Sequence, residues 1–378
     1  MAITRITTAN AIADSSVQNI KMSNIVQSKN IIINGDMSIA QRGTSFTGQT
    51  AANYIVDRFT QNINGAMGTW TNGQSTTVPT GQGFANSLIM DCTTADASPA
   101  ASDILWVQQR IEGQNLQYLK KGTANAESTT LSFWVKSNKT GTYIAELEDR
   151  DNSRYVSQSY TISSADTWEK KTVTFPADTS GAFGNDNGDS LRLNFWLGAG
   201  TDWTSGTLGT TWHTTAANRA VGQVNLADST SNDFYITGVQ LEAGTTASEF
   251  EFLPYDVNLD RCERYFKIVL RSTGGDTTIC NGAMYDASQF FGTFEIGKGM
   301  RTIPTMSATS GTNFYGVVGN NATYSFNSLT FGGISNAGTS KCRIYVNSVS
   351  GKSQGQAVWI RFKDASSTSD FISASSEL

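Results

Sequence analysis

From residue 30 onward, the chain consists of short stretches in which apolar and polar residues alternate. In residues 129–137 (TTLSFWVKS), Leu131, Phe133 and Val135 fall on one side of an extended strand, whereas Trp134 falls on the other. Five further stretches have the same strand-like character: residues 142–149, 155–163, 168–177, 190–198 and 233–244. Loops rich in Gly, Asp, Asn and Thr separate them. This spacing predicts an all-β fold that begins with an antiparallel β-sandwich of the jelly-roll type.

One stretch, residues 252–270 (FLPYDVNLDRCERYFKIVL), has the spacing of a short helix that leads into a new strand. We therefore assign residues 30–253 to the jelly-roll domain and residues 254–378, where strand-like stretches resume, to a second, smaller β-sandwich domain. Residues 1–29 are polar and follow no period. We expect them to form an extended N-terminal arm that becomes ordered on a partner.

Charge and hydropathy exclude several classes of partner. The net charge is −5 and no block of Lys or Arg occurs, so the footprint of a nucleic-acid-binding protein is missing. No apolar stretch approaches the roughly 20 residues that span a bilayer, and the N-terminus lacks the apolar core of a signal peptide. We expect neither nucleic-acid binding nor membrane insertion.

The residues that usually carry catalysis are sparse. The four cysteines are widely spaced and form no CxxC pair, which indicates buried free thiols, and the single histidine, His213, cannot build a multi-histidine metal site. The Gly-rich runs contain no phosphate-binding motif. Four carboxylates cluster in one stretch, but we interpret them as solvated surface charge: Glu146, Glu148, Asp149 and Asp151. We expect no enzymatic activity and no cofactor.

Several motifs, in order, connect the chain to a known family. They are NIIINGDMSIAQRGTSFT (30–47), NYIVDRF (53–59), LSFWVKSNKTGTYIAEL (131–147), TWEKKTVTFPAD (167–178), FYITGVQLEAGTTASEFEF (234–252) and CERYF (262–266). Together they resemble bacteriophage tail-fibre and receptor-binding proteins that carry a jelly roll like that of carbohydrate-binding modules. KGMRTIPTMSATS (298–310) is similar to a segment of their C-terminal domains.

The resemblance implies a virion protein, usually a homotrimer, that is assembled in the host cytoplasm and becomes part of the phage tail. Residues 1–29 would attach to another tail protein, and the sandwich domains would contact a host surface glycan or receptor. Related jelly rolls often hold a structural calcium through an acidic residue after the first turn and an Asp on the last strand. Here Asp36 fits the first position, but Thr237 occupies the second, so we expect no metal, although Asp233 and Glu242 could supply oxygens nearby.

We interpret the opening motif, residues 30–47, as a structural element of the first domain rather than a binding site. Its apolar run, residues 31–33, predicts a first strand buried on both sides, and Asn34 and Gly35 suit a turn with positive φ. Arg42 and the Asp57-Arg58 pair could tie the following polar loop to the sandwich through charge-assisted hydrogen bonds.

Sugar recognition combines an aromatic platform with planar polar side chains. If the apolar positions fill the core, one outward face would carry a suitable set: Trp134, Trp196, Arg192, Asn194, Glu146 and Glu148. The alternative is that both tryptophans pack under loops, a neighbouring subunit or the second domain. We expect Trp168, at the start of its strand, in the core.

The loop of residues 198–219 is a second candidate, with Trp203, Trp212 and His213 as anchors; alternatively, it is ordered against a neighbouring subunit. The sequence thus favours a non-enzymatic tail-fibre protein that binds host glycans. Two alternatives remain: a purely structural virion protein and, with less support, a tail spike that cleaves polysaccharide with paired carboxylates.

Overall fold

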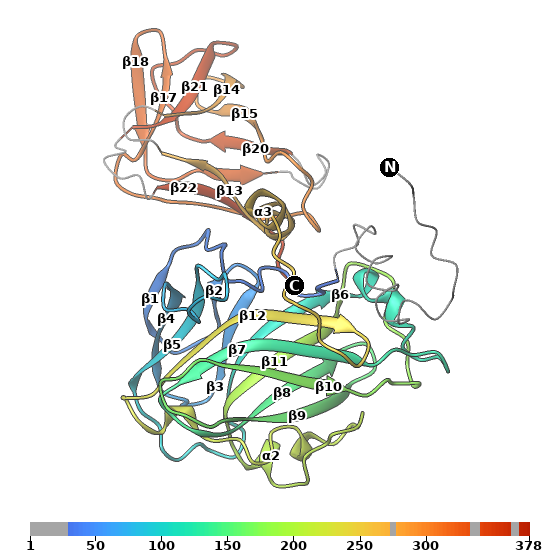
Figure 1. The fold of residues 1–378 in the computed structure, drawn as a ribbon. Helices are drawn as coiled ribbons and strands as arrows, with labels where there is room; N and C mark the ends of the chain where they lie inside the picture. The colour runs from blue at the N-terminus through green and yellow to red at the C-terminus, as the bar shows by residue number, and fades with distance from the viewer. Residues whose placement is uncertain (1–28, 273–276, 333–340, 364–369) are drawn as a thin grey trace, which may run out of the picture.

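The computed structural model describes residues 29–272, 277–332, 341–363 and 370–378. The predicted arm, residues 1–29, lies outside these ranges except for Lys29. The chain is almost entirely β, as predicted, and forms two antiparallel sandwiches with helix α3 (Tyr255–Glu263) between them (Figure 1). The short helix expected from the sequence is therefore confirmed.

The first sandwich has two six-stranded sheets. Sheet I has the strand order β1 (Ser45–Gln49), β4 (Thr69–Ser75), β5 (Ser87–Thr94), β12 (Asp233–Ala243), β7 (Thr129–Ser137) and β10 (Glu169–Phe175). Sheet II has the order β2 (Asn53–Val56), β3 (Phe59–Asn64), β6 (Ile104–Glu112), β11 (Asp189–Ala199), β8 (Gly141–Asp149) and β9 (Arg154–Ile162). The chain crosses repeatedly from one sheet to the other, which gives the jelly-roll topology.

Short helical segments lie in the connections of this sandwich. They are η1 (Gly113–Asn115), η2 (Gln117–Leu119), α2 (Thr201–Thr204), η3 (Ala216–Asn218) and η4 (Leu226–Asp228).

The core between the sheets follows the predicted alternation. Leu131, Phe133 and Val135 of β7 face Leu193 and Phe195 of β11, and all five are completely buried in one cluster. The rings of Phe133 and Phe195 meet edge to face, with centroids 5.1 Å apart. Full burial of each side chain of this size stabilises the fold by about 1.5–3 kcal/mol.

The opening run, residues 31–33, is buried as expected but forms no strand, so that prediction is wrong. Ile32 joins the main core, whereas Ile33 packs beside Tyr265 at the start of the second domain. Asn34 has the predicted positive φ, 61°. Gly35 is needed for a different reason, because a Cβ there would lie 2.1 Å from a backbone oxygen of β12. The run thus bends between the two domains instead of pairing in a sheet.

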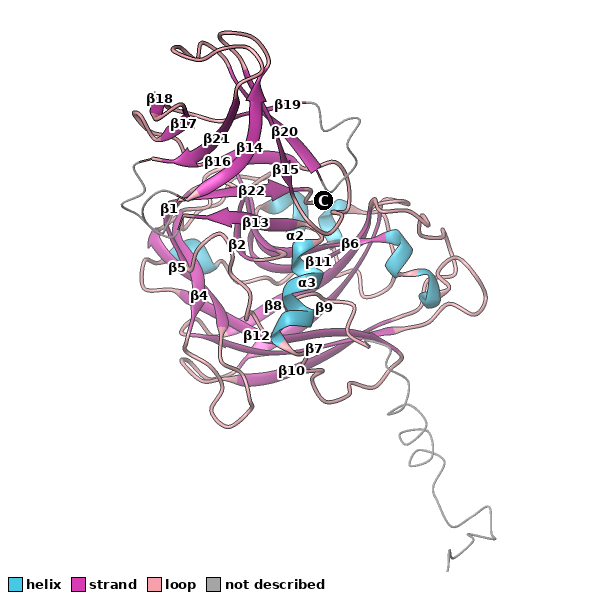
Figure 2. Cartoon of the chain, turned by 90° about the horizontal axis from the view of Figure 1, so that it is seen from above, coloured by secondary structure: helices cyan, strands magenta, loops and turns pink. Residues whose placement is uncertain are grey.

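The second sandwich is smaller, as predicted, and pairs a seven-stranded sheet with a three-stranded one (Figure 2). Sheet III has the order β18 (Ala322–Phe326), β17 (Tyr315–Gly319), β21 (Ala357–Phe362), β14 (Thr278–Met284), β15 (Phe290–Glu295), β20 (Lys341–Val346) and β19 (Thr330–Gly332). Sheet IV has the order β13 (Phe266–Arg271), β22 (Phe371–Ser375) and β16 (Thr305–Ala308). Their facing sides form a separate core.

Two further sequence features can be placed. All four cysteines are buried and unpaired, as expected. Among the residues described, no helix combines the length and apolarity needed to span a membrane.

Candidate functional site

The predicted glycan-binding set divides between the two outer faces of the first sandwich. Trp134 lies on β7 of sheet I, whereas Arg192, Asn194 and Trp196 lie on β11 and Glu146 on β8 of sheet II. The expectation that they share one face is therefore wrong. Each side chain does point outward, but alternation along a strand does not say which of two sheets the strand joins.

The chain itself closes most of the outer face of sheet II. Residues 200–222 follow β11, run along the edge of β9 and fold back over the sheet. The backbone N–H groups of Tyr155 and Ser157 donate to carbonyls of this loop at 2.8 Å each. We call the covered residues the closed face; all are at most 8% exposed: Trp106, Gln108, Glu146, Glu148, Asn194 and Trp196.

Arg219, at the end of the covering loop, neutralises the buried carboxylates. Its Nε and Nη2 donate to the two carboxylate oxygens of Glu146 at 2.8 and 2.6 Å, and Nη2 also reaches Glu148 at 3.2 Å. Asn194 donates to both glutamates at 2.8 and 3.2 Å and accepts from Gln108 at 2.7 Å. Burial opposes ionisation of Glu148, but Arg219 and other cations outweigh it and lower the pKa of Glu148 below its usual value.

Aromatic rings enclose the same guanidinium. The Cζ of Arg219 lies 4.0 Å from the ring centroid of Tyr155 and 5.3–5.7 Å from those of Trp203, Trp196 and Trp106. These geometries allow cation–π attraction, which is stronger when the groups are desolvated. Arg219 is the residue that the sequence did not single out, since nothing near it in the loop indicates a partner 73 positions away.

The interpretation of the carboxylate cluster as solvated surface charge is therefore wrong for three of its four members, and only Asp151 is exposed. Glu146 and Glu148 are buried under Arg219, and Asp149 is buried in an ion pair with Lys121 at 2.5 Å. Each buried carboxylate is engaged by a cation that the chain supplies. This arrangement favours a structural role for the cluster.

The remaining predicted residues also have partners within the chain. Arg192 is partly exposed and binds Asp189 at 2.5–2.7 Å. Trp212 donates from Nε1 to the carbonyl of Pro176 at 2.8 Å and packs against the main core. The loop of residues 198–219 is thus ordered against its own sandwich.

One half of the outer face of sheet I is covered as well. Phe84, Phe250 and Phe252 form an aromatic trio with centroids 4.9–5.1 Å apart. Phe84 lies directly over Gly238 of β12, where a Cβ would come within 2.6 Å of its ring. The segment that follows β12 also binds this half, since Ser248 donates to Glu242 at 2.7–2.8 Å.

Among the residues described, no segment covers the other half, which carries partly exposed aromatic side chains. Lys136 lies on β7, Tyr235 on β12, and Trp168 immediately before β10. The ring centroids of Trp168 and Tyr235 are 6.3 Å apart, and the Nζ of Lys136 lies 4.3 Å from the Tyr235 centroid. Trp134 lies on the same outward side of β7 as Lys136, beside Lys170 of β10. These residues, which we call the open face, are partly or fully exposed. Trp168, expected in the core, belongs to this face.

Two carboxylates border the open face. Asp91 and Asp233 lie opposite each other on β5 and β12. Partial burial raises the pKa of both above the ordinary value, and in Asp233 the neighbouring Asp91 adds to the effect. The open face therefore combines partly exposed rings, two lysines and hydrogen-bond acceptors.

The two residues at the positions where related jelly rolls bind calcium, Asp36 and Thr237, form hydrogen bonds within the chain. Asp36 accepts from the side chain of Asn258 in α3 at 3.0 Å and from the Ser38 hydroxyl at 3.0 Å. Thr237 donates to the carbonyl of Asn86 at 2.7 Å. No group of three or more His, Cys, Asp or Glu side chains arranged to hold a metal occurs within the described ranges.

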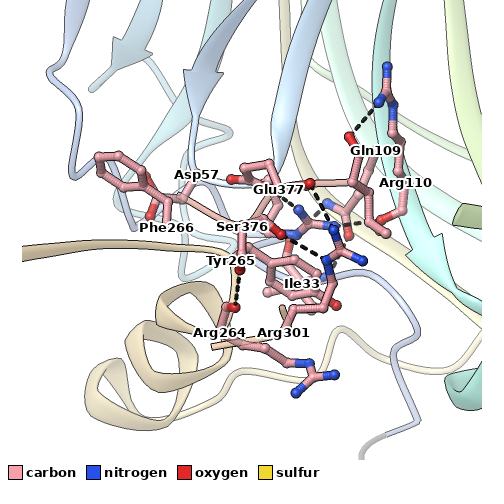
Figure 3. Close-up of polar contacts among 12 residues, drawn as sticks. Ile33, Asp57, Gln109, Arg110, Arg264, Tyr265, Phe266, Arg301, Ser376 and Glu377 are labelled. Atoms are coloured by element: carbon pink, nitrogen blue, oxygen red, sulfur yellow. Dashed lines mark hydrogen bonds and ion pairs between the residues drawn. The ribbon is translucent and has the colours of Figure 1, made fainter. Parts of the chain in front are cut away.

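The opening motif and the CERYF motif meet at the joint between the domains (Figure 3). The guanidinium of Arg42 stacks 3.5 Å from the centroid of Phe266, and that of Arg58 stacks 3.5 Å from Tyr265. Both arginines also bind the carboxylate of Glu377, Arg42 at 3.2 Å. Residues predicted to tie a loop to its own sandwich thus also hold the second domain.

The C-terminal residues complete this joint. Arg110 of β6 donates to the carbonyl of Leu378, and Arg301 donates to that of Ser376 at 2.7 Å (Figure 3). Arg264 forms a bidentate pair with Glu112 at 2.7 and 2.8 Å. Bidentate pairs with this geometry fix orientation as well as distance. Three motifs of the sequence resemblance, residues 30–47, 53–59 and 262–266, therefore contribute to the domain joint.

Comparisons with known proteins find only distant structural similarity. No protein-family model and no curated protein sequence matches the chain. Among solved structures, the enzymatically active domain of bacteriophage CBA120 tailspike protein 4 is 14% identical, with 57% of this chain and 21% of that chain covered and a TM-score of 0.30. A putative sugar-binding protein from Bacteroides thetaiotaomicron is 14% identical, with 57% of this chain and 99% of that protein covered and a TM-score of 0.32.

A family 11 carbohydrate-binding module from Clostridium thermocellum is 12% identical, with 54% of this chain and 98% of the module covered and a TM-score of 0.25. The chain thus spans only about a fifth of the tailspike structure, but its matched part spans nearly all of the two binding proteins. Similarity at this level assigns no family and no function to the chain.

Proposed function

We propose that the chain is a bacteriophage tail-fibre, or receptor-binding, protein whose first sandwich binds a glycan of the host surface through the open face. The observation that carries the proposal is a set of partly exposed side chains on a sandwich whose opposite outer face is closed by the chain itself: Trp134, Lys136, Trp168 and Tyr235. The ordered series of motifs that resembles tail-fibre proteins supports the setting in the virion.

The chemistry of the open face suits a sugar. Indole and phenol rings pack against the apolar C–H face of a pyranose, while the lysines donate to hydroxyls and the aspartates accept from them. The contacts of the partly exposed rings are apolar, so ionic strength screens them only weakly. Individual contacts of this kind are weak, so a trimeric fibre would gain adsorption strength by engaging several sites at once.

Binding without cleavage is the activity that we propose. Paired carboxylates of a glycosidase must be free to take and give protons at the scissile bond. Here Glu146 and Glu148 are both buried and bound by Arg219 and Asn194. Residues 1–29 would attach the fibre to another tail protein.

Adsorption to periodate-treated cells tests the proposal. Periodate cleaves vicinal diols of surface glycans and leaves most protein receptors intact. We expect fluorescently labelled protein to adsorb to a susceptible host and to lose most of this adsorption after periodate treatment. Adsorption that protease abolishes and periodate does not would replace the glycan with a protein receptor. Adsorption to no host cell would instead favour a purely structural virion protein.

A further inference from the structure

A groove with a volume of about 480 Å³ lies at the joint between the two domains. One of its walls comes from the short helices η1 and η2, and the other comes from α3. Binding sites for ligands typically have volumes of roughly 300–1,000 Å³, so the groove has room for several side chains. Its floor is apolar and buried, and consists of Ile31, Ile33, Ile111 and Tyr265.

At one end, the groove already binds the main chain of residues 30–33. The side-chain amide of Gln109 accepts from the N–H of Ile33 at 2.8 Å and donates to its carbonyl at 2.9 Å (Figure 3). Arg261 of α3 donates to the carbonyl of Asn30 at 3.3 Å. These contacts engage peptide groups and do not depend on the identity of the side chains. The groove is therefore built to hold an extended stretch of polypeptide.

The wall formed by η1 and η2 remains open to a further segment. Gln114, Asn115 and Tyr118 are exposed on this wall, Tyr118 by 41%. The amide of Asn115 has no partner within the described ranges, so it can donate to and accept from a passing main chain. On the opposite wall, Arg264 is neutralised by Glu112. The open part therefore suits an uncharged segment with a few apolar side chains.

The N-terminal arm enters the described structure at this groove. Asn30 lines the groove and is only 5% exposed, and its N–H donates to the carboxylate of Glu251 at 2.9 Å. Residues 1–28 lie outside the described ranges, but covalent continuity places their last residues beside Asn30. The occupant that the position of the groove favours is therefore the chain immediately before Asn30.

The sequence of this stretch suits the groove. Residues 22–28 (MSNIVQS) carry no charge, so they add nothing to the cations of the walls. Successive side chains of an extended segment point to opposite sides, so either Ile25 or Val26 faces the apolar floor in any register.

We propose that residues 22–28 dock in this groove of their own chain as an extended segment. At about 3.3–3.6 Å per residue, Val26 can lie up to about 14 Å from Asn30, which allows it to follow the groove. The tether gives the segment an effective concentration on the order of millimolar, so weak contacts are sufficient. Docking fixes the direction in which the arm leaves the domain joint and leaves residues 1–21 for a partner. The inference does not depend on glycan binding by the open face.

Disulfide cross-linking of the full chain tests the proposal. The test variant is Val26→Cys/Asn115→Cys, with the second cysteine in the groove. The matched control is Val26→Cys/Tyr255→Cys, because Tyr255 is 63% exposed and close to Glu251 in sequence but does not line the groove. The four natural cysteines are buried and should not compete. Under mild oxidation, we expect the groove pair to cross-link within one chain at least tenfold faster than the control pair.

Equal rates for the two pairs would overturn the proposal, because an undocked arm reaches both positions. Cross-links between two chains, seen as dimers on a non-reducing gel, would also overturn it and assign the groove to the arm of a second copy.

Limited digestion with trypsin supplies a readout without new cysteines. Lys21 borders the docked segment, whereas Arg5 lies far from it in the same arm. We expect cleavage after Lys21 to be at least fivefold slower than cleavage after Arg5, and Gln114→Ala/Tyr118→Ala to remove most of this difference. Both substituted side chains are exposed, so circular dichroism should confirm intact folding. Equal cleavage at the two sites in the wild type would contradict docking.

Discussion

The two outer faces of the first sandwich look alike in sequence and differ in structure. Both carry tryptophans next to charged residues on strands of the same alternation. The closed face of sheet II has all its charges paired under a loop, with Arg219 bound to Glu146 and Glu148. The open face of sheet I keeps Trp134, Lys136 and Tyr235 partly exposed. The difference shows that what covers an outward tryptophan decides whether its side chain is buried or stays partly exposed.

The physical cause of the difference is one long connection. The loop between β11 and β12 is long enough to return over sheet II, and it brings a cation to two carboxylates that would otherwise face water. Burying those carboxylates is tolerable only because Arg219 and Asn194 satisfy them. Within the part of the chain that the structure describes, no such connection reaches the half of sheet I that holds Trp134.

The largest effect is expected from removing the cation of the closed face. Arg219→Met leaves Glu146 and Glu148 buried without a counter-ion, which should lower the free energy of unfolding by roughly 3–5 kcal/mol. Urea unfolding followed by tryptophan fluorescence measures it, because seven of the eight tryptophans lie before residue 254. Arg192→Met, at a partly exposed ion pair, should cost less than about 1 kcal/mol. Equal, small losses in both variants would mean that the closed face contributes little.

Matched tryptophan substitutions sharpen the comparison. Trp196→Ala empties a fully buried site and should cost about 3 kcal/mol or more, because the cavity cannot collapse completely. Trp134→Ala, on the open face, should cost about 1 kcal/mol, since the indole is only partly buried. The same urea experiment reads both. A greater loss for Trp134→Ala would reverse the assignment of the two faces.

The two faces should respond to pH with opposite signs. The pKa of Glu148 is lowered in the folded chain, so its stabilisation is present above about pH 4.5 and is lost as the pH falls through the folded value. The pKa of Asp233 is raised, so its contribution is greatest below about pH 3.8 and declines as the pH rises through the folded value.

Measuring the free energy of unfolding between pH 3 and 7 tests whether Glu148 and Asp233 contribute to stability with opposite pH dependence. Glu148→Gln should flatten the acid side of the curve, and Asp233→Asn should remove a decline that begins near pH 4. Changes of the same sign in both variants would refute the assigned environments.

The smallest effect on stability is expected at Lys136. Its ammonium interacts with Tyr235 at the surface, so Lys136→Ala should change the free energy of unfolding by less than about 0.5 kcal/mol. The same variant should still weaken adsorption to host cells, because the lysine is one of few donors on the open face. A loss of stability without a loss of adsorption would make Lys136 a structural residue.

The sequence was sufficient for what local periodicity determines. The inward residues of β7 and β11, helix α3 and the two-sandwich organisation follow from alternation, turn residues and Pro254. The assignment of strands to sheets did not follow, because it depends on pairings between distant segments. For the same reason, the sequence could not reveal that Arg219 covers Glu146, or that Arg42 and Arg58 reach Glu377 at the far end of the chain.

Adsorption of a Trp134→Ala/Tyr235→Ala double variant to a susceptible host tests the central claim most directly. The control is Arg192→Ala, which alters a charged, partly exposed residue of sheet II and leaves the open face intact. With all forms shown to be folded and in the same oligomeric state, we expect the double variant to adsorb at least tenfold more weakly, a loss of about 1.4 kcal/mol, and the control to adsorb like the wild type. Undiminished adsorption of the double variant would contradict the assignment of binding to the open face.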